Sequence, residues 1–141
     1  MSKPDSSHLT IHVDGASRGN PGPAGVGITI DDEQGTTRVR ISSYIGETTN
    51  NQAEYKALIM GLREAARLGA EHIDIKTDSK LVVEQVRGKY KVRHANLGPL
   101  FEEAKQLLAE FRSFTITHIP RHQNNAADAL ANEAVDRHLR H

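Results

Sequence analysis

Residues 9–30 read LTIHVDGASRGNPGPAGVGITI, in which two apolar segments flank a segment rich in glycine and proline. Apolar and polar residues alternate from Leu9 to Asp14, which predicts a half-buried strand that ends at Asp14. Residues 26–30 predict a second strand. A hairpin turn needs only roughly two to five residues, so we interpret residues 15–25 as a loop that does more than reverse the chain. Asp14 is then either an ordinary turn residue before a glycine or a ligand of a metal ion.

The chain has 141 residues, of which 37% are hydrophobic and 26% are charged, and it contains no cysteine. This composition predicts a single globular domain at residues 9–141, after a disordered lead-in of residues 1–8. The lack of cysteine excludes disulfides and thiolate metal sites and agrees with a reducing compartment. No apolar run is long enough to span a membrane, and the N-terminus lacks the apolar core of a signal peptide. We therefore expect a cytoplasmic protein that does not enter a membrane.

The remaining hydrophobic pattern predicts three more strands and four helices. The predicted strands are residues 39–45, 72–77 and 114–119, and the predicted helices are residues 52–68, 79–88, 97–111 and a last helix capped by Asn124 or Asn125. The element order is β-β-β-α-β-α-α-β-α. This order predicts an α/β fold, in which helices flank a five-stranded mixed sheet whose later strands pair in parallel.

Four acidic residues lie where predicted strands end or predicted helices begin. Asp14 and Asp78 end two strands, and parallel strands bring their ends to one edge of a sheet. Glu54 and Asp128 lie in the first turns of two helices, in line with apolar residues, so both are predicted to face the sheet. Each acid has a simpler role on its own, as a turn residue, a helix cap or a partner of the helix dipole. Together, four inward-facing acids repel one another unless cations bind, and oxygen ligands suit Mg²⁺ or Mn²⁺.

The segments that carry these acids resemble the motifs of the type 1 ribonuclease H family. The resemblance covers residues 9–139 and rests on four segments in order: DGASRGNPGPAG at 14–25, TTNNQAE at 48–54, TDS at 77–79 and NNAADALA at 124–131. It implies the ribonuclease H-like fold and hydrolysis of the RNA strand of RNA/DNA hybrids, with 5′-phosphate and 3′-hydroxyl products. It also implies two Mg²⁺ ions per site, replaceable by Mn²⁺. Asp14 would bridge both ions, Glu54 and Asp78 would complete one metal site, and Asp128 would complete the other.

The resemblance further implies that polar side chains of the first two motifs contact the minor groove of the hybrid. A side-chain amide both donates to and accepts from a 2′-hydroxyl, the group that distinguishes RNA from DNA. The glycines and prolines of residues 19–25 would keep the loop low beside Asp14, with a loop shaped only for folding as the alternative. The expected substrate-binding residues near the site are Ser17, Asn20, Asn50, Asn51, Gln52 and Ser79.

His122 follows the fifth predicted strand, where the family has a mobile catalytic histidine that helps to move protons or to release product. An imidazole whose pKa lies near neutrality suits this role. His118 lies on the strand itself and is the rival candidate, which we interpret as structural.

The chain carries 18 basic and 18 acidic residues, so its formal net charge is zero and nucleic-acid binding must depend on local clusters. Residues 87–94, RGKYKVRH, form one such cluster, with a solvated loop as the alternative. Many bacterial members of the family carry an extra basic helix and loop, but the segment between Asp78 and the helix predicted from residue 97 is too short to contain them. In this respect the chain is similar to the archaeal and plant-like members, which lack this extra helix. We therefore expect a weaker grip on the hybrid and a stronger dependence on salt, and it stays open whether double-stranded RNA is cut. The cluster residues expected to contact substrate are Arg87, Lys89 and Lys91.

Two other functions fit the same residues. The chain could bind nucleic acid without cutting it well, or it could be a different phosphoryl-transfer nuclease of this fold, such as a strand-transfer or junction-cutting enzyme. The set of four acids argues against the first alternative, because acids that repel one another without a metal would destabilise the fold. The asparagines favour RNA recognition over the second. We expect a monomer, because the sequence has no spare apolar stripe.

Overall fold

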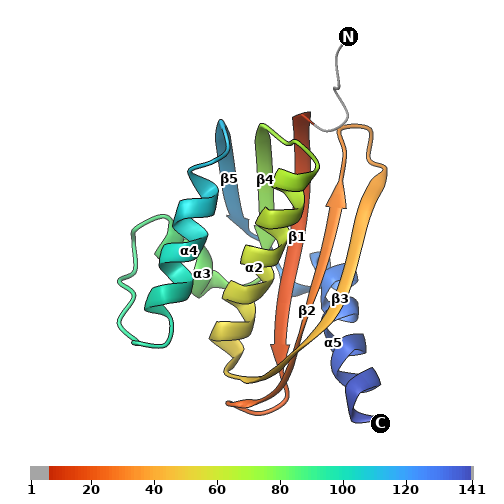
Figure 1. Cartoon of the computed structure of the whole chain (residues 1–141), viewed down its shortest axis with the longest axis vertical. Helices are drawn as coiled ribbons and strands as arrows, with labels where there is room; N and C mark the ends of the chain where they lie inside the picture. The colour runs from red at the N-terminus through yellow and green to blue at the C-terminus, as the bar shows by residue number, and fades with distance from the viewer. Residues whose placement is uncertain (1–6, 141) are drawn as a thin grey trace.

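The computed structural model describes residues 7–140, which form a five-stranded sheet with helices on both faces (Figure 1). The strand order is β3-β2-β1-β4-β5. β1 pairs antiparallel with β2, and β2 with β3, whereas β4 pairs in parallel with both β1 and β5. The predicted α/β fold with a mixed sheet is therefore confirmed. The strands are β1 (His8–Ser17), β2 (Gly22–Asp31), β3 (Thr37–Thr48), β4 (His72–Thr77) and β5 (Ser113–His118).

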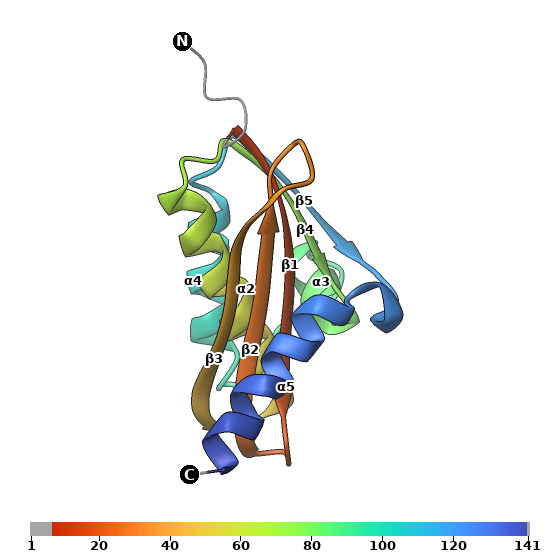
Figure 2. The same ribbon diagram turned by 90° about the vertical axis from the view of Figure 1, so that its right-hand side faces the viewer.

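The helices lie in two layers. Helices α2 and α4 cover one face of the sheet, whereas α5 crosses the opposite face (Figure 2). No helix within residues 7–140 is long and apolar enough to cross a bilayer. The helices are α2 (Asn50–Arg67), α3 (Lys80–Val86), α4 (Gly98–Leu108) and α5 (Asn125–Leu139), with a short 3-10 helix, η1 (Arg121–Gln123), before α5.

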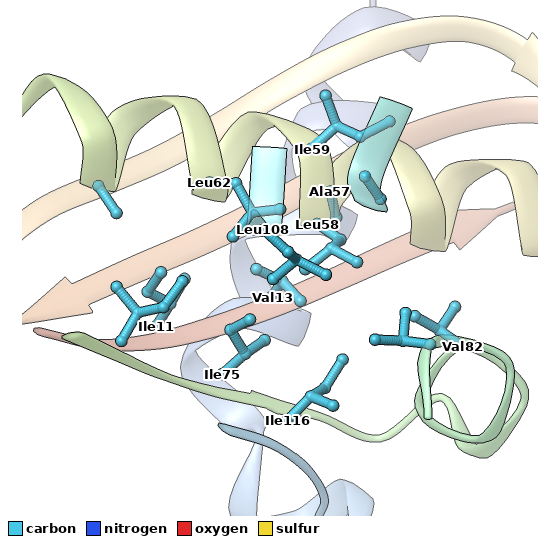
Figure 3. Close-up of a cluster of buried hydrophobic side chains, with 14 of the residues drawn as sticks. Ile11, Val13, Ala57, Leu58, Ile59, Leu62, Ile75, Val82, Leu108 and Ile116 are labelled. Carbon is cyan, nitrogen blue, oxygen red and sulfur yellow. The ribbon is translucent and has the colours of Figure 1, made fainter. Parts of the chain in front are cut away.

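The main hydrophobic core lies between the sheet and helices α2 and α4 (Figure 3). The alternating residues Ile11 and Val13 of β1 point into this core, where they meet Leu58 and Leu62 of α2. Full burial of each such side chain contributes about 1.5–3 kcal/mol. The start of α2 is fixed by a capping box, in which the Thr49 side chain accepts from the backbone N–H of Gln52 and the Gln52 side chain accepts from that of Thr49. Core packing and the cap together position the first turns of α2 against β1.

The glycine- and proline-rich segment is a hairpin rather than the predicted long loop. Strand β1 continues to Ser17 and β2 begins at Gly22, so only residues 18–21 form the turn. Asp14 therefore lies within β1, opposite Gly27 of β2, and not at the end of the strand. The physical reason is the close approach of α5, because a Cβ at Gly27 would lie 1.9 Å from the carbonyl oxygen of Ala127. The glycines of β2 leave space for a helix, which the sequence pattern alone did not reveal.

Other element boundaries differ from the predictions by a few residues. Strand β1 begins at His8, inside the stretch predicted as a disordered lead-in, while residues 1–6 of that stretch lie outside the described part of the chain. Helix α3 ends at Val86 rather than near Gly88. Asn124 occupies the position before α5 but makes no side-chain capping hydrogen bond, because its side chain contacts other strands.

Candidate active site

Three carboxylates meet where β1 and β4 run side by side. In the parallel register Val13 lies opposite Thr77, so the next residues, Asp14 and Asp78, are neighbours across the two strands. Glu54 reaches them from α2. One carboxylate oxygen of each residue lies within 4.8 Å of those of the other two. The structure thus brings together three of the four predicted acids, and we call Asp14, Glu54 and Asp78 the acidic triad.

Gly15 joins the triad to the start of α2. Its backbone N–H donates to Oε1 of Glu54 at 2.9 Å. A Cβ at Gly15 would lie 2.2 Å from the backbone carbon of Ala53, so a larger residue would push α2 away from β1. The glycine that follows the aspartate in the sequence therefore allows Glu54 to reach the triad.

Two acids of the triad, Asp14 and Glu54, are buried, and the third, Asp78, is half-buried. Asp14 is 4% exposed and Glu54 is 8% exposed. Burial, followed by the charges of Glu54 and Asp78, raises the pKa of Asp14 to about 10. Burial also raises the pKa of Glu54 to about 8, although the hydrogen bond from Gly15 lowers it. Without a cation, the triad therefore retains protons at neutral pH.

The metal-free protein is expected to lose stability as the pH rises. Both acids have higher pKa values in the folded chain than their ordinary values near 4 in the unfolded chain, so the folded state binds more protons in the window from about 4 to the folded values of about 8 and 10. The free energy of unfolding falls with pH wherever the folded state binds more protons. Thermal melts in EDTA at pH 5.5 and pH 8.5 should show the lower melting temperature at pH 8.5. A melting temperature that is constant or rises across this window would contradict the prediction.

Asp128, the fourth predicted acid, lies beside the triad rather than within it. Its side chain is 27% exposed, and Nη2 of Arg121 lies 3.5 Å from its Oδ1. A hydrogen bond between Asp128 and Asp14 contributes to the raised pKa of Asp14. Ala131 and Val135, the residues predicted to share its inward face, are both fully buried, whereas Asp128 itself is half-buried. It lies at the margin of the buried face of α5.

An open pocket with a volume of about 300 Å³ surrounds the triad. Its polar lining includes Arg18, Arg121 and Asn132, which the sequence did not single out. Arg121 is the residue before the predicted His122, and Asn132 follows Asp128 by one helical turn, so a search around the predicted residues would have found both. The residues outside the triad that line the pocket are Gly15, Ala16, Ser17, Arg18, Asn50, Arg121 and Asn132.

Most of the predicted substrate-binding residues also form hydrogen bonds within the protein. Asn50 accepts from the backbone N–H of Ser17 through Oδ1 at 3.3 Å, and its own N–H donates to Oδ1 of Asn20 at 2.9 Å. Gln52 is held in the capping box of α2, where its Oε1 accepts from Oγ1 of Thr48 at 2.6 Å. Ser79 caps α3 through its hydroxyl, which accepts from the N–H of Val82 at 3.3 Å. These side chains therefore hold the β1–β2 turn and the starts of α2 and α3 in place around the site, and we call them the frame of the site.

The basic cluster at residues 87–94 lies next to this frame. A second open pocket of about 530 Å³ runs along it and reaches Asn51 at the start of α2. Arg87 has a different environment, because its Nη2 donates to the carbonyl oxygen of Ile116 in β5 at 2.7 Å. The cluster residues that line the pocket are Lys89, Tyr90, Lys91, Arg93 and His94.

Comparison with known proteins places the chain in a family. A family model described as reverse transcriptase-like matches residues 12–134. Ribonuclease HI of Halobacterium salinarum is 46% identical over 135 residues, which are 95% of this chain and 68% of that protein. The chain belongs to the type 1 ribonuclease H family. The solved structure of LC11-RNase H1 in complex with an RNA/DNA hybrid has a TM-score of 0.88 and 43% identity, covering 93% of this chain and 99% of that one.

Some relatives in the family are much longer. The bifunctional protein Rv2228c of Mycobacterium tuberculosis is 45% identical over 129 residues, which are 91% of this chain but 35% of that protein. The chain thus spans about a third of the length of this relative. What the two have in common is the ribonuclease H-like domain.

The two candidate histidines lie outside the triad. His122 is exposed on η1, directly after Arg121, and His118 is exposed at the end of β5. Asn124, which follows η1, is by contrast only 1% exposed. Its Nδ2 donates to the carbonyl oxygen of Val13 at 2.9 Å and lies 3.4 Å from Oδ1 of Asp78. Asn124 therefore ties the start of α5 to both strands that carry the triad.

Proposed function

We propose that this chain is a ribonuclease H that hydrolyses the RNA strand of RNA/DNA hybrids and leaves 5′-phosphate and 3′-hydroxyl ends. The observation that carries the proposal is the acidic triad, whose oxygens lie within 4.8 Å of one another at an open pocket. The hybrid bound to LC11-RNase H1, at 43% identity, supports the choice of substrate.

The triad has the chemistry of a site for divalent metal ions. It offers only carboxylate oxygens, which Mg²⁺ and Mn²⁺ prefer. Burial and neighbouring acids raise the pKa values of Asp14 and Glu54, and a divalent cation at the triad would favour the ionised form of both. Asp14, Glu54 and Asp78 would hold one Mg²⁺ ion, and Asp14 together with Asp128 would hold the other. Bound Mg²⁺ would supply Lewis-acid activation of the attacking water and of the leaving oxygen.

The protein's own side chains would orient the hybrid and handle its charge. Because Oδ1 of Asn50 accepts from the Ser17 N–H, its amide NH₂ group is left to donate to a 2′-hydroxyl. Arg121 is 76% exposed at the pocket and would contact a phosphate oxygen. His122 follows it and is exposed, so its imidazolium would donate a proton to the departing 3′-oxygen and regain one from solvent.

The proposal is tested with purified protein and four end-labelled substrates: RNA/DNA hybrid, double-stranded RNA, single-stranded RNA and double-stranded DNA. Each substrate is incubated with Mg²⁺, Mn²⁺ or EDTA. We expect metal-dependent cutting of the RNA strand of the hybrid, with products whose 5′ ends lose phosphate to a phosphatase. Hybrid that is bound in a mobility-shift assay but not cut with either metal would identify a binding module instead. The lane with double-stranded RNA decides how broad the activity is.

The basic cluster should contribute to substrate binding rather than to chemistry. Replacing Lys89 and Lys91 together by alanine removes two cations from the pocket beside Asn51. We expect KM for the hybrid to rise several-fold at low salt, and the slope of log KM against log salt to fall by about 1 for each phosphate that the variant no longer neutralises. The matched control is Lys105→Ala on α4, where the Lys105 ammonium lies over the Phe101 ring. An unchanged salt slope in the double variant would show that the cluster is only a solvated loop.

We also propose that the chain acts as a monomer in the cytoplasm. The large hydrophobic residues exposed within the described chain are few and belong to different elements. They are Tyr90, Phe114 and Leu139. A sedimentation experiment at micromolar concentration measures the association state directly.

A further inference from the structure

The side-chain orientation of Asp128 is restrained in a different way from that of the acids of the triad. Asp14 and Glu54 are only 4% and 8% exposed and are restrained by packing, whereas the Asp128 side chain is 27% exposed and lies on a helix surface. An exposed aspartate changes rotamer freely unless hydrogen bonds restrain it. The structure supplies such a bond from the same helix, because Nδ2 of Asn132 donates to the backbone oxygen of Asp128 at 2.9 Å and lies 3.3 Å from its Oδ1.

The amide of Asn132 is oriented in turn by Arg18. Nη2 of Arg18 donates to Oδ1 of Asn132 at 3.2 Å. A guanidinium has only donors, so it must face the amide oxygen and direct the amide nitrogen towards Asp128. Arg18 is itself held by Asp136, whose Oδ1 lies 2.7 Å from Nη1. The turn between β1 and β2 is thereby linked through α5 to the fourth carboxylate.

We propose that Arg18 and Asn132 are positioning residues that set the orientation of Asp128 as a metal ligand. The inference rests on the proposed function, in which Asp128 completes the second metal site. Both Asn132 and Arg121 contact Oδ1 of Asp128. The second oxygen, Oδ2, would then be left to bind the metal ion.

A purely structural role for this network would have a small effect. The side chains of Arg18 and Asp136 are 37% and 49% exposed, and ion pairs at such exposure contribute little to stability. Residues that orient a metal ligand, by contrast, typically change metal affinity or activity by about 10- to 100-fold when they are replaced. Measuring both the metal dependence and the stability of variants at these residues therefore distinguishes a positioning role from a structural one.

The experiment compares Asn132→Ala and Arg18→Ala with the wild-type chain and with Asp128→Asn. Mn²⁺ binding is measured by calorimetry on the free protein, and hybrid cleavage is measured over a range of Mg²⁺ concentrations. We expect both alanine variants to bind Mn²⁺ more weakly and to need about 10-fold more Mg²⁺ for half-maximal cleavage. The melting temperature of the metal-free protein should stay unchanged. The matched control is Glu133→Gln, which removes an exposed ion pair with Arg137 from the same helix and should behave like the wild-type chain.

Three results would overturn the inference in different ways. If Asp128→Asn shifts the Mg²⁺ dependence and the two alanine variants do not, only the positioning role fails. If the alanine variants lose melting temperature at unchanged Mg²⁺ dependence, the network is structural. If Asp128→Asn and the wild-type chain have the same Mg²⁺ dependence, the proposed role of Asp128 fails as well.

Discussion

Replacing Asp14 by asparagine is expected to reduce hybrid cleavage by about 10³-fold or more. A carboxylate oxygen of Asp14 lies within 4.8 Å of oxygens of Glu54 and Asp78, and Asp128 also raises the pKa of Asp14. Asparagine has the same shape but no charge, so each metal ion would lose a ligand that the proposed mechanism shares between them. Metal-ion catalysis stabilises the transition state by several kcal/mol, and each 1.36 kcal/mol is a factor of about ten in rate. Single-turnover cleavage of a labelled hybrid at saturating Mg²⁺ measures the loss.

The same substitution should leave the metal-free protein at least as stable as the wild type. Because burial and neighbouring charges disfavour the ionised form of Asp14, a neutral side chain removes an unfavourable term from the folded state. Loss of activity in a variant with an unchanged or higher melting temperature therefore reports on chemistry and not on folding. Asp74→Asn is the matched control, because Asp74 is an aspartate on the neighbouring strand β4 that pairs with His8 away from the pocket. A fall of less than tenfold in the Asp14 variant would exclude the two-metal proposal.

The parts of the fold that the sequence predicts are those with a strong local pattern. Ile11 and Val13 alternate with polar residues, and a slip of one residue would turn both away from the core, so the pattern specifies the face of β1. The parallel pairing of β1 with β4 then follows from the crossover through α2. This pairing is what makes Asp14 and Asp78 neighbours, and the prediction that they lie close together is confirmed.

The sequence was less informative about residues whose role depends on contacts with residues far away in the chain. The glycines of residues 15–25 resemble a loop because local propensity carries no information about the helices that approach their backbone. Arg18 and Asn132 were missed for a similar reason, because they are joined by a hydrogen bond between residues far apart in the chain. Asn124 was predicted only as a helix cap, and its hydrogen bond to Val13 was not predicted.

Gly27→Ala is expected to destabilise the protein by about 3 kcal/mol, at the upper end of the range for overpacking. The added Cβ would lie 1.9 Å from the carbonyl oxygen of Ala127 and 2.6 Å from the backbone nitrogen of Ala131. Both atoms belong to the backbone of α5, so no side chain can rotate to make room and the whole helix must move from the sheet. Urea denaturation followed by circular dichroism measures the change in the free energy of unfolding.

Gly98→Ala is the matched control, because a Cβ there meets nothing within 4 Å and the change should be neutral or slightly stabilising. Gly27 also pairs with Asp14 across the β1–β2 ladder, and α5 carries Asp128 towards the triad from the other side. A shift of α5 at this point would therefore separate Asp128 from Asp14, and any Gly27→Ala protein that folds should need more Mg²⁺ for cleavage than the wild type. A variant within about 1 kcal/mol of the wild type, with the same Mg²⁺ dependence, would show that α5 is not held against β2 as closely as the glycine contact requires.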